Sequence, residues 1–400
     1  MMTRPIQRDV VIVGAGIAGL ALAAALAEKG LRVALLEAGP RPVSPKSTAD
    51  LAGWDLRVSA LTPSSTRLLD QLGVWPTLAT QRIGPYDQMQ VWDAEGTGNI
   101  RFSGAGLGIP VLGHIVENRL TIDSLLAVVE RAENVNIIWQ DPVAGLTRDA
   151  SGHPLITTAS GSQLSAPLLV GADGANSQLR NLANFEVRRW SYHQRAIVAT
   201  ISLASSHQNT CYQAFLSSGP LAVLPLAQDN YCALVWSLDD DVWESRAALN
   251  DCDFIDALNR ALGQRLPAVN GISQRGVFPL NQCHAVDYIQ PRIALLADAA
   301  HSIHPLAGQG INLGLADVRV LAEEVGRAAE AGLDWGEKAV LKRYQRQRKS
   351  ENLAMMVAME GFKRGFGSQN PLLRVARNMG LSWVDHSAPI KHWLAKQALR

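Results

Sequence analysis

Residues 9–37 read DVVIVGAGIAGLALAAALAEKGLRVALLE, and this stretch decides the fold. Its first part, Val10–Val13, is a short β-branched run that predicts a strand buried on both faces. Residues 16–29 are rich in Ala and Leu and predict a helix, which Gly30 would end in a left-handed conformation. Residues 31–37 predict a second strand. Two parallel strands joined by a crossover helix indicate an α/β fold with a Rossmann-like domain.

Three glycines in this stretch form the pattern Gly14-Ala-Gly16-Ile-Ala-Gly19, and Glu37 ends the second strand. Gly14 permits a tight turn, Gly16 lets the backbone approach a pyrophosphate, and Gly19 lets helix and strand pack closely. The helix N-terminus offers free N–H groups to phosphates, and Glu37 is placed to accept hydrogen bonds from ribose hydroxyls. A structural glycine turn is the alternative, but the complete strand–helix–strand–acid context favours dinucleotide binding.

The composition narrows the class of protein. Of 400 residues, 47% are hydrophobic and 18% are charged, which excludes wholesale disorder. The net charge of +1 argues against a dedicated nucleic-acid binder. The uncharged residues 10–27 could be read as a membrane span, but their glycines and the flanking Asp9 and Glu28 favour a buried strand and helix. We therefore expect a cytoplasmic protein, at most peripheral at the inner face of a membrane.

Two further segments favour FAD over NAD. Residues 171–180 (GADGANSQLR) follow a predicted strand, although an ordinary Asp-Gly turn is the alternative. Residues 297–314 (ADAAHSIHPLAGQGINLG) also follow a predicted strand, so Asp298 would point into the crevice where ligands bind and hold ribityl hydroxyls, which NAD lacks. Gly308 and Gly310 would let the backbone approach a flat ring. A helix beginning near Gly310 would direct its dipole toward the flavin.

At these residues the chain resembles the flavin-dependent aromatic hydroxylases of the p-hydroxybenzoate hydroxylase fold. Residues 304–317 (HPLAGQGINLGLAD) resemble the signature of the ubiquinone-biosynthesis branch. The resemblance spans nearly the whole chain. Within the branch, the chain looks most like the enzyme that hydroxylates C5 of the ring of a 2-polyprenylphenol. Segments 55–60, 112–118, 171–180 and 277–280 support the branch, and segments 112–118, 196–201 and 346–362 support the resemblance to the C5 enzyme.

The resemblance implies a set of FAD-binding residues. Glu37 would bind ribose, and Arg57 and Asn118 would lie along the phosphate and ribityl portion. Asp173 would lie near the pyrophosphate, and Asp298 would bind the ribityl chain. The implied cofactor-binding residues are Gly14, Gly16, Gly19, Glu37, Arg57, Asn118, Asp173, Asp298, Gly308, Gln309, Gly310, Ile311 and Asn312. No catalytic residue is assigned, and the candidates beside the reacting ring are Pro305, Gly308, Gly310 and Asn312.

One residue departs from the family pattern, and no metal site is expected. Ala297 stands where the family usually has Gly, and its methyl group is expected to crowd the cofactor. His301 and His304 have a metal-like spacing, but no acidic partner follows at metal spacing, so a loop-stabilising or flavin-proximal role is favoured. The cysteines form no C-x-x-C and are interpreted as isolated thiols in a reducing compartment: Cys211, Cys232, Cys252 and Cys283.

The pattern of elements predicts a discontinuous nucleotide domain. Alternating segments between residues 195 and 238, separated by turn signals, predict an antiparallel sheet inserted into the chain. The FAD-binding domain is assigned to residues 1–80, 110–182 and 281–335. The substrate-binding sheet domain is assigned to residues 81–109 and 183–280, and a C-terminal helical region to residues 336–400. Within it, residues 338–400 carry 13 Lys and Arg against 3 Asp and Glu, a net of +10, and leave two roles open: docking to a membrane or protein partner, or a solvated helix face.

The resemblance implies an FAD-dependent monooxygenase that hydroxylates the aromatic ring of a polyprenylated phenol in ubiquinone biosynthesis. NAD(P)H would be the reductant and O2 the co-substrate, with transfer through a C4a-hydroperoxyflavin. The implied partners are the phenol, other ubiquinone-biosynthesis proteins or a membrane surface, and no nucleic acid. The alternatives are a flavin hydroxylase of another small aromatic substrate, a non-hydroxylating FAD oxidoreductase, and a flavin-bound scaffold without activity.

Overall fold

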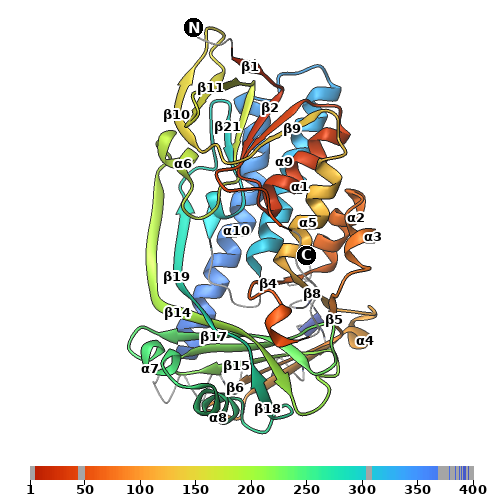
Figure 1. The fold of residues 1–400 in the computed structure, drawn as a ribbon, viewed down its shortest axis with the longest axis vertical. Coiled ribbons are helices and arrows are strands. Elements are labelled where there is room, and N and C mark those ends of the chain that lie inside the picture. Colours follow the sequence, from red (N-terminus) through yellow and green to blue (C-terminus); the bar gives the residue numbers. More distant parts are fainter. Residues whose placement is uncertain are drawn as a thin grey trace.

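A computed structural model describes residues 5–43, 50–302 and 309–367, and single residues beyond them at positions 378, 383, 387, 389, 391, 392 and 395. Figure 1 shows an elongated molecule with a sheet at each end, joined by the long strands β14 and β19 and by helix α10. No helix of these described ranges combines the length and apolar character that crossing a bilayer requires.

A six-stranded sheet forms one end of the molecule. Its strand order is β20-β21-β13-β2-β3-β9, and all its pairs are parallel except β20 with β21. The strands at its centre are buried on both faces, as their continuous apolar sequences predict. In spatial order they are Ile289–Gln290, Ile293–Leu295, Leu168–Gly171, Val10–Val13, Val33–Leu36 and Val135–Ile138.

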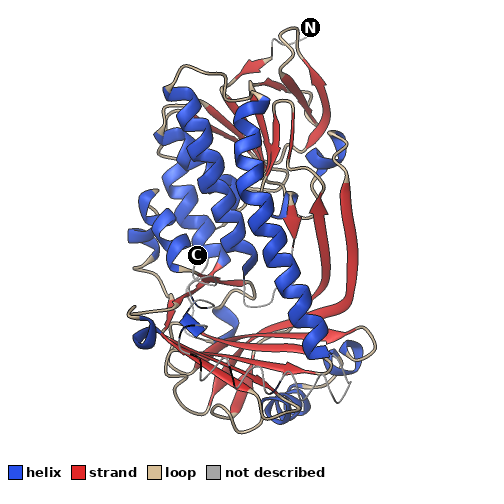
Figure 2. Cartoon of the chain, turned by 180° about the vertical axis from the view of Figure 1, so that it is seen from behind, coloured by secondary structure: helices blue, strands red, loops and turns tan. Residues whose placement is uncertain are grey.

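Helices cover this sheet (Figure 2). The first helix, α1, packs between α5 and α9, and α10 packs on α9. Residues 17–26 of α1 are therefore all buried, which explains why this helix is apolar on every side. The four helices are α1 (Ile17–Glu28), α5 (Asn118–Val129), α9 (Gln309–Glu330) and α10 (Lys338–Gly367).

A large sheet forms the other end of the molecule. Its order is β22-β19-β14-β17-β16-β15-β6-β7, and β18 pairs with β14 beside this path. The prediction of an antiparallel sheet is wrong at one pair, because β15 and β6 run parallel. Since β6 and β7 come from an earlier part of the chain, a long connection allows this direction. In spatial order the strands are His301–Ser302, Gly276–Ala285, Val187–Leu203, Tyr231–Asp239, Gly219–Pro225, Thr210–Leu216, Gln88–Asp93 and Asn99–Ser103, with β18 at Val269–Ile272.

The two faces of the large sheet have different partners. Helix α8 (Asp251–Leu262) covers one face, where Phe254 and Leu258 pack against Ile197. On the other face, Val198 packs with Leu56, which precedes Arg57 in the opposite half of the molecule. The face without α8 is therefore the one that meets the nucleotide-binding half.

Short elements complete the fold. A three-stranded sheet of β4 (Val58–Leu61), β8 (Gly113–Glu117) and β5 (Gly84–Tyr86) lies between the two large sheets. A four-stranded sheet consists of β1 (Ile6–Gln7), β12 (Gln163–Ser165), β11 (Pro154–Thr158) and β10 (Val143–Arg148). The short helices are η1 (Leu51–Gly53), α2 (Pro63–Gln71), α3 (Trp75–Leu78), α4 (Gly104–Leu107), α6 (Gln178–Leu182), α7 (Trp243–Ala247) and η2 (Ala297–Ala299).

Helix α5 begins earlier than its sequence suggests. The apolar pattern predicts a helix over 123–132, but α5 spans Asn118–Val129. Its first two residues are polar, and a distant residue caps its start: the carboxylate of Asp55 accepts a hydrogen bond of 3.2 Å from the N–H of Arg119. A cap supplied from another part of the chain leaves no local sequence signal.

Candidate cofactor site

The turn between β2 and α1 has the geometry that its glycines predict. Gly14 takes a φ of +103°, and a Cβ there would lie 2.5 Å from the main-chain oxygen of Ala172. A Cβ at Gly19 would lie 1.8 Å from the main-chain oxygen of Gly14. Both positions therefore exclude a side chain. A Cβ at Gly16 would meet no atom of the described residues within 4 Å apart from its chain neighbours, so the backbone at the start of α1 stays accessible to a ligand.

Glu37 connects this turn to the end of β3. Its Oε2 accepts a hydrogen bond of 2.7 Å from the N–H of Ala15, and its Oε1 accepts one of 2.8 Å from the N–H of Gly39. The half-buried carboxylate is thus held in one orientation by two main-chain donors. Because each carboxylate oxygen has more than one lone pair, it keeps acceptor capacity for ribose hydroxyls.

A cleft of about 390 Å³ opens beside this turn, at the carboxyl ends of β2, β3 and β13. Ligands of open α/β sheets bind at this end of the strands. Asp141 also lines this cleft and was not predicted from the sequence, because strand β9, which it follows, was not predicted either. An acidic residue after an apolar run, the pattern seen at Glu37, would have indicated it. The lining residues are Val13, Gly14, Gly16, Leu36, Glu37, Ala38, Asp141, Pro142, Val143, Ala172, Asp173, Gly174, Asn176 and Gln178.

Asp173 lines the same cleft and also caps a helix. Its carboxylate accepts a hydrogen bond from the hydroxyl of Ser177, and further bonds of 2.8 and 3.1 Å from the N–H groups of Gln178 and Leu179. These donors belong to the start of α6. The structure therefore places Asp173 beside the predicted pyrophosphate position, with its charge directed toward α6.

The predicted ribityl acid lies at the second part of the site. Asp298 is in the short helix η2, and its side chain is open to solvent. Protein atoms still surround it closely, so desolvation raises the pKa of Asp298, while the charges of His301 and Arg57 oppose this rise. The structure thus brings Arg57 and Asp298 near each other, although 241 positions separate them in the chain.

Asn118 joins the same neighbourhood through the backbone. Its N–H donates a hydrogen bond of 2.9 Å to the main-chain oxygen of Arg57. Its Oδ1 accepts one of 2.6 Å from the hydroxyl of Ser59. The segment carrying Arg57 is thereby tied to the N-terminus of α5.

The start of α9 divides into open and buried residues. Among the described residues, a Cβ at Gly310 would meet no atom within 4 Å beyond its own chain neighbours and helix backbone, and Gly310 does not have a positive φ. Ile311 packs against the core of the six-stranded sheet. The amide of Asn312 is buried: its Oδ1 accepts hydrogen bonds from the N–H of Thr62 and the hydroxyl of Ser65, at 3.0 and 2.7 Å.

Asn312 therefore anchors α9 to β4 and α2, since its Nδ2 also donates a 2.8 Å hydrogen bond to the main-chain oxygen of Ala60. Helix α9 begins at Gln309, as predicted for a helix starting near Gly310. The predicted residues His304, Pro305 and Gly308 lie outside the described residues.

His301 is engaged in a hydrogen bond inside the protein. It is buried, and its Nε2 lies 2.5 Å from Oδ2 of the buried Asp317. Within the described part of the chain, no group of three or more His, Cys, Asp and Glu side chains is arranged to hold a metal ion. All four cysteines are free, and Cys252 is the exposed one.

The residues fit a dinucleotide that carries a polyol chain. Open space at Gly16 and Gly310 would admit a pyrophosphate and a flat ring, and Glu37 and Asp298 supply acceptors at the two ends. The fold and this two-part site define a flavoprotein of the Rossmann-like class. The chain belongs to the family described as "FAD binding domain", whose model matches residues 7–358.

Curated relatives agree with this assignment along nearly the whole chain. The chain is 36% identical over 392 residues to the 3-demethoxyubiquinol 3-hydroxylase of Escherichia coli (strain K12), covering 98% of each protein. It is 33% identical to the mitochondrial ubiquinone biosynthesis monooxygenase COQ6 of Xenopus tropicalis, covering 97% of this chain and 92% of the relative. It is 35% identical to the ubiquinone hydroxylase UbiL of Rhodospirillum rubrum, covering 98% and 89%.

Solved structures share the fold. The p-nitrophenol 4-monooxygenase PnpA of Pseudomonas putida DLL-E4 superposes with a TM-score of 0.81 at 19% identity, covering 99% of this chain and 98% of that one. HpxO of Klebsiella pneumoniae, complexed with FAD and uric acid, gives a TM-score of 0.72 at 20% identity, covering 98% and 97%. The resemblance to the ubiquinone-biosynthesis branch of flavin hydroxylases is confirmed: the chain is an FAD-dependent aromatic-ring monooxygenase.

Proposed function

We propose that the chain hydroxylates the aromatic ring of a polyprenylated phenol in ubiquinone biosynthesis, with NAD(P)H as reductant and O2 as co-substrate. Full-length similarity to three hydroxylases named for the ubiquinone pathway supports the substrate class. The relative from Escherichia coli is named for 3-demethoxyubiquinol, whereas the sequence resembles the C5-hydroxylase of 2-polyprenylphenol.

The observation that carries the proposal is an apolar surface between the two halves of the molecule. On the face of the large sheet that lacks α8, Val198 and Val235 pack toward Leu56, adjacent to Arg57. A Cβ at Gly276 would lie 3.1 Å from Leu56 and from Phe278, and the Phe278 side chain is 40% exposed. An exposed aromatic ring among aliphatic side chains suits an apolar aromatic substrate.

The proposed roles of the protein side chains are binding, orientation and exclusion of water. Bound FAD supplies the redox chemistry. Glu37 and the N-terminus of α1 would hold its adenosine and pyrophosphate, and Asp298 its ribityl hydroxyls. The N–H groups at the start of α9, beside Gly310, would stabilise negative charge on the ring. The apolar face of the large sheet would exclude water from the phenol.

Analysis of the quinone intermediates in a strain that lacks this chain tests the proposal. We expect a polyprenylated phenol lacking one ring hydroxyl to accumulate and ubiquinone to fall, and the mass spectrum of that intermediate gives the ring position. The unaltered gene should restore ubiquinone, and a gene encoding Asp298→Ala should not. An unchanged ubiquinone content would contradict the proposed substrate class.

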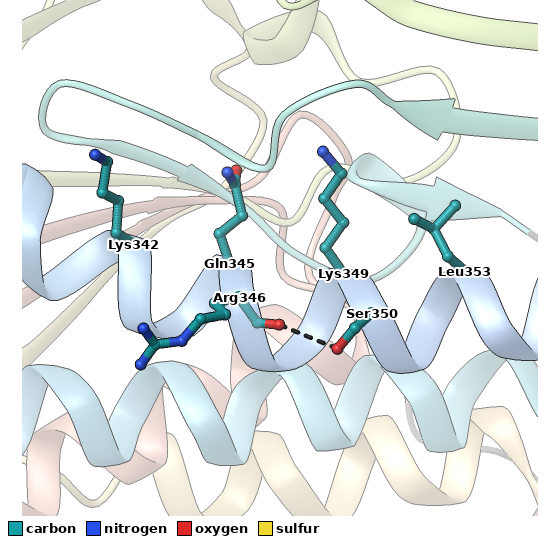
Figure 3. Close-up of a pocket in the computed structure, with 6 residues that line it drawn as sticks. All are labelled: Lys342, Gln345, Arg346, Lys349, Ser350 and Leu353. Atoms are coloured by element: carbon teal, nitrogen blue, oxygen red, sulfur yellow. Dashed lines mark hydrogen bonds between the residues drawn. The ribbon is translucent and has the colours of Figure 1, made fainter.

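A second proposal concerns α10, whose surface we infer to dock on an anionic membrane, where a polyprenylated substrate resides. Figure 3 shows the side chains of Lys342 and Lys349 projecting to one side of α10 and that of Arg346 in another direction; all three line one surface pocket. Further along α10, Leu353 and Val357 are 38% and 71% exposed at a spacing of four residues, which places them on one helix face. Basic and apolar side chains in sequence along one helix suit a membrane interface.

Some basic side chains of α10 form ion pairs with acidic residues of the same protein. Arg348 is buried against Asp317, and Arg343 forms an ion pair of 2.5 Å with the buried Glu324. Lys349 lies 3.6 Å from Asp287. The docking proposal therefore depends mainly on Lys342 and Arg346, both of which are exposed.

A further inference from the structure

A buried carboxylate behind the FAD site receives four hydrogen-bond donors. Asp317 of α9 is fully buried. Its Oδ1 accepts from Nε of Arg348 at 2.7 Å and from Nδ2 of Asn352 at 3.2 Å, both on α10. Its Oδ2 accepts from Nε2 of His301 at 2.5 Å and from the N–H of Ala297 at 3.0 Å. One carboxylate thus connects α9, α10 and the turn that carries the predicted ribityl acid.

The carboxylate is ionised in this environment. Burial alone would raise the pKa of Asp317, but the charges and hydrogen bonds of His301 and Arg348 lower it to about 2. Arg348 is itself buried, and its NH2 donates a hydrogen bond of 2.9 Å to Oδ1 of Asn352. The ion pair of Arg348 and Asp317 is therefore held in one geometry by hydrogen bonds as well as by charge.

Ala297 is the residue of this turn that needs support. Its φ is +51°, the left-handed region that residues with a Cβ disfavour. Its methyl group faces α9, because a Cβ at Gly314 would lie 2.8 Å from it. The Cβ of Ala297 therefore makes the turn before Asp298 costly to form.

We propose that Asp317 is a positioning residue that holds Ala297 in its left-handed conformation, and that Arg348 orients Asp317 for this task. In the observed turn the N–H of Ala297 donates a hydrogen bond of 3.0 Å to Oδ2 of Asp317, and this bond favours the conformation that presents Asp298 to FAD. Helix α10 is thereby linked to cofactor affinity. The inference rests on FAD as cofactor and is independent of the proposed substrate.

A double-mutant cycle with a rescue tests the proposal. Glycine takes the left-handed conformation without strain, so Ala297→Gly should make the hydrogen bond from Asp317 dispensable. FAD is titrated onto apoprotein, and its dissociation constant is measured together with the thermal unfolding of the apoprotein. We expect Asp317→Asn to raise the FAD dissociation constant at least about tenfold, or about 1.4 kcal/mol, in the natural background. In the Ala297→Gly background the rise should be less than about threefold.

An equal fold-change of the FAD dissociation constant in both backgrounds would overturn the proposal. That result is expected if Asp317→Asn only loosens the core, because such an effect does not depend on residue 297. If the Asp317→Asn apoprotein shows no cooperative unfolding, Arg348→Lys replaces it in the same two backgrounds with the same expectation. Arg343→Lys is the matched control on α10. Arg343 pairs with Glu324 and not with Asp317. The Arg343→Lys substitution should therefore leave the FAD dissociation constant unchanged in both backgrounds.

Discussion

The buried guanidinium of Arg180 donates a hydrogen bond of 2.9 Å to the main-chain oxygen of Ala299. A second bond, of 2.7 Å, goes to the main-chain oxygen of Ala175. Arg180 thus ties the turn of residues 171–180 to the turn that carries Asp298. This side chain adds to the pairing of β13 with β21, which brings together the same two parts of the candidate FAD site.

Arg180→Met should destabilise the apoprotein. Two buried carbonyls lose their donors, each at a cost of about 1–3 kcal/mol, partly offset because a buried cation is removed. We expect the free energy of unfolding to fall by about 2 kcal/mol in chemical denaturation. The control is Arg148→Met: exposed Arg148 also donates to two carbonyls, those of Gly152 and Pro291, and its loss should change stability by less than about 0.5 kcal/mol. Equal effects would show that Arg180 has no special role.

Asp298→Ala should weaken FAD binding. A ribityl hydrogen bond to a charged acceptor is worth about 1.5–3 kcal/mol, so the dissociation constant should rise about tenfold or more. Titration of FAD onto apoprotein measures the change. Asp241→Ala, at an exposed acid between β17 and α7, should leave the affinity unaltered. Equal retention of FAD by the two variants would remove Asp298 from the site.

The raised pKa of Asp298 has a consequence for pH dependence. Desolvation disfavours the charged carboxylate in the folded apoprotein, so Asp298→Asn should raise the free energy of unfolding at neutral pH. That gain should vanish below the ordinary value of 3.8, where both folded and unfolded chains are protonated. Affinity for FAD should fall in the natural protein as the pH approaches the raised pKa from above, and Asp298→Asn should lack this dependence. Parallel pH profiles of the two proteins would contradict the assignment.

Gly310→Val should remove FAD binding and spare the fold. The backbone at Gly310 has no positive φ, and its Cβ position has open space among the described residues, so we expect the apoprotein to tolerate valine. A flavin in contact with this backbone would collide with the new side chain. Gly361→Val is the matched control, because Gly361 is also helical with open space at its Cβ. Normal flavin content in the Gly310 variant would show that this turn is remote from the ring.

Vesicle binding tests the docking surface of α10. Each Lys or Arg near an anionic surface contributes about 1 kcal/mol, so Lys342→Gln with Arg346→Gln should lower partitioning onto anionic vesicles roughly thirtyfold. Arg67→Gln with Arg131→Gln removes the same charge from other exposed positions and should have little effect. Binding that ignores vesicle charge and salt, or no binding by the natural protein, would defeat the electrostatic docking proposal.

The dinucleotide end of the site was predictable because its chemistry is local. Gly14, Gly16, Gly19 and Glu37 lie within one strand–helix–strand unit, and their spacing alone fixes their relations. The boundaries of β2, α1 and β3 accordingly agree with the sequence pattern to within a residue or two.

The flavin end was less predictable because it depends on distant contacts. Asn312 was expected beside the ring, yet its amide is hydrogen-bonded to the segment 60–65, some 250 positions away. The links from Asp317 to Arg348 and from Arg180 to Ala299 likewise join separate parts of the chain. No local sequence pattern encodes such distant partners. The sequence therefore identifies these polar residues but not the groups to which they are hydrogen-bonded.

Oxygen transfer to the ring is the central claim, and one measurement tests it most directly. The FAD-loaded protein is given NADH, a short-chain polyprenylated phenol and isotopically labelled O2, and the product is examined by mass spectrometry. We predict that NADH consumption accelerates when the phenol is added and that one labelled oxygen atom appears on the product ring. NADH oxidation with no label in the phenol would contradict the account and indicate a non-hydroxylating FAD oxidoreductase.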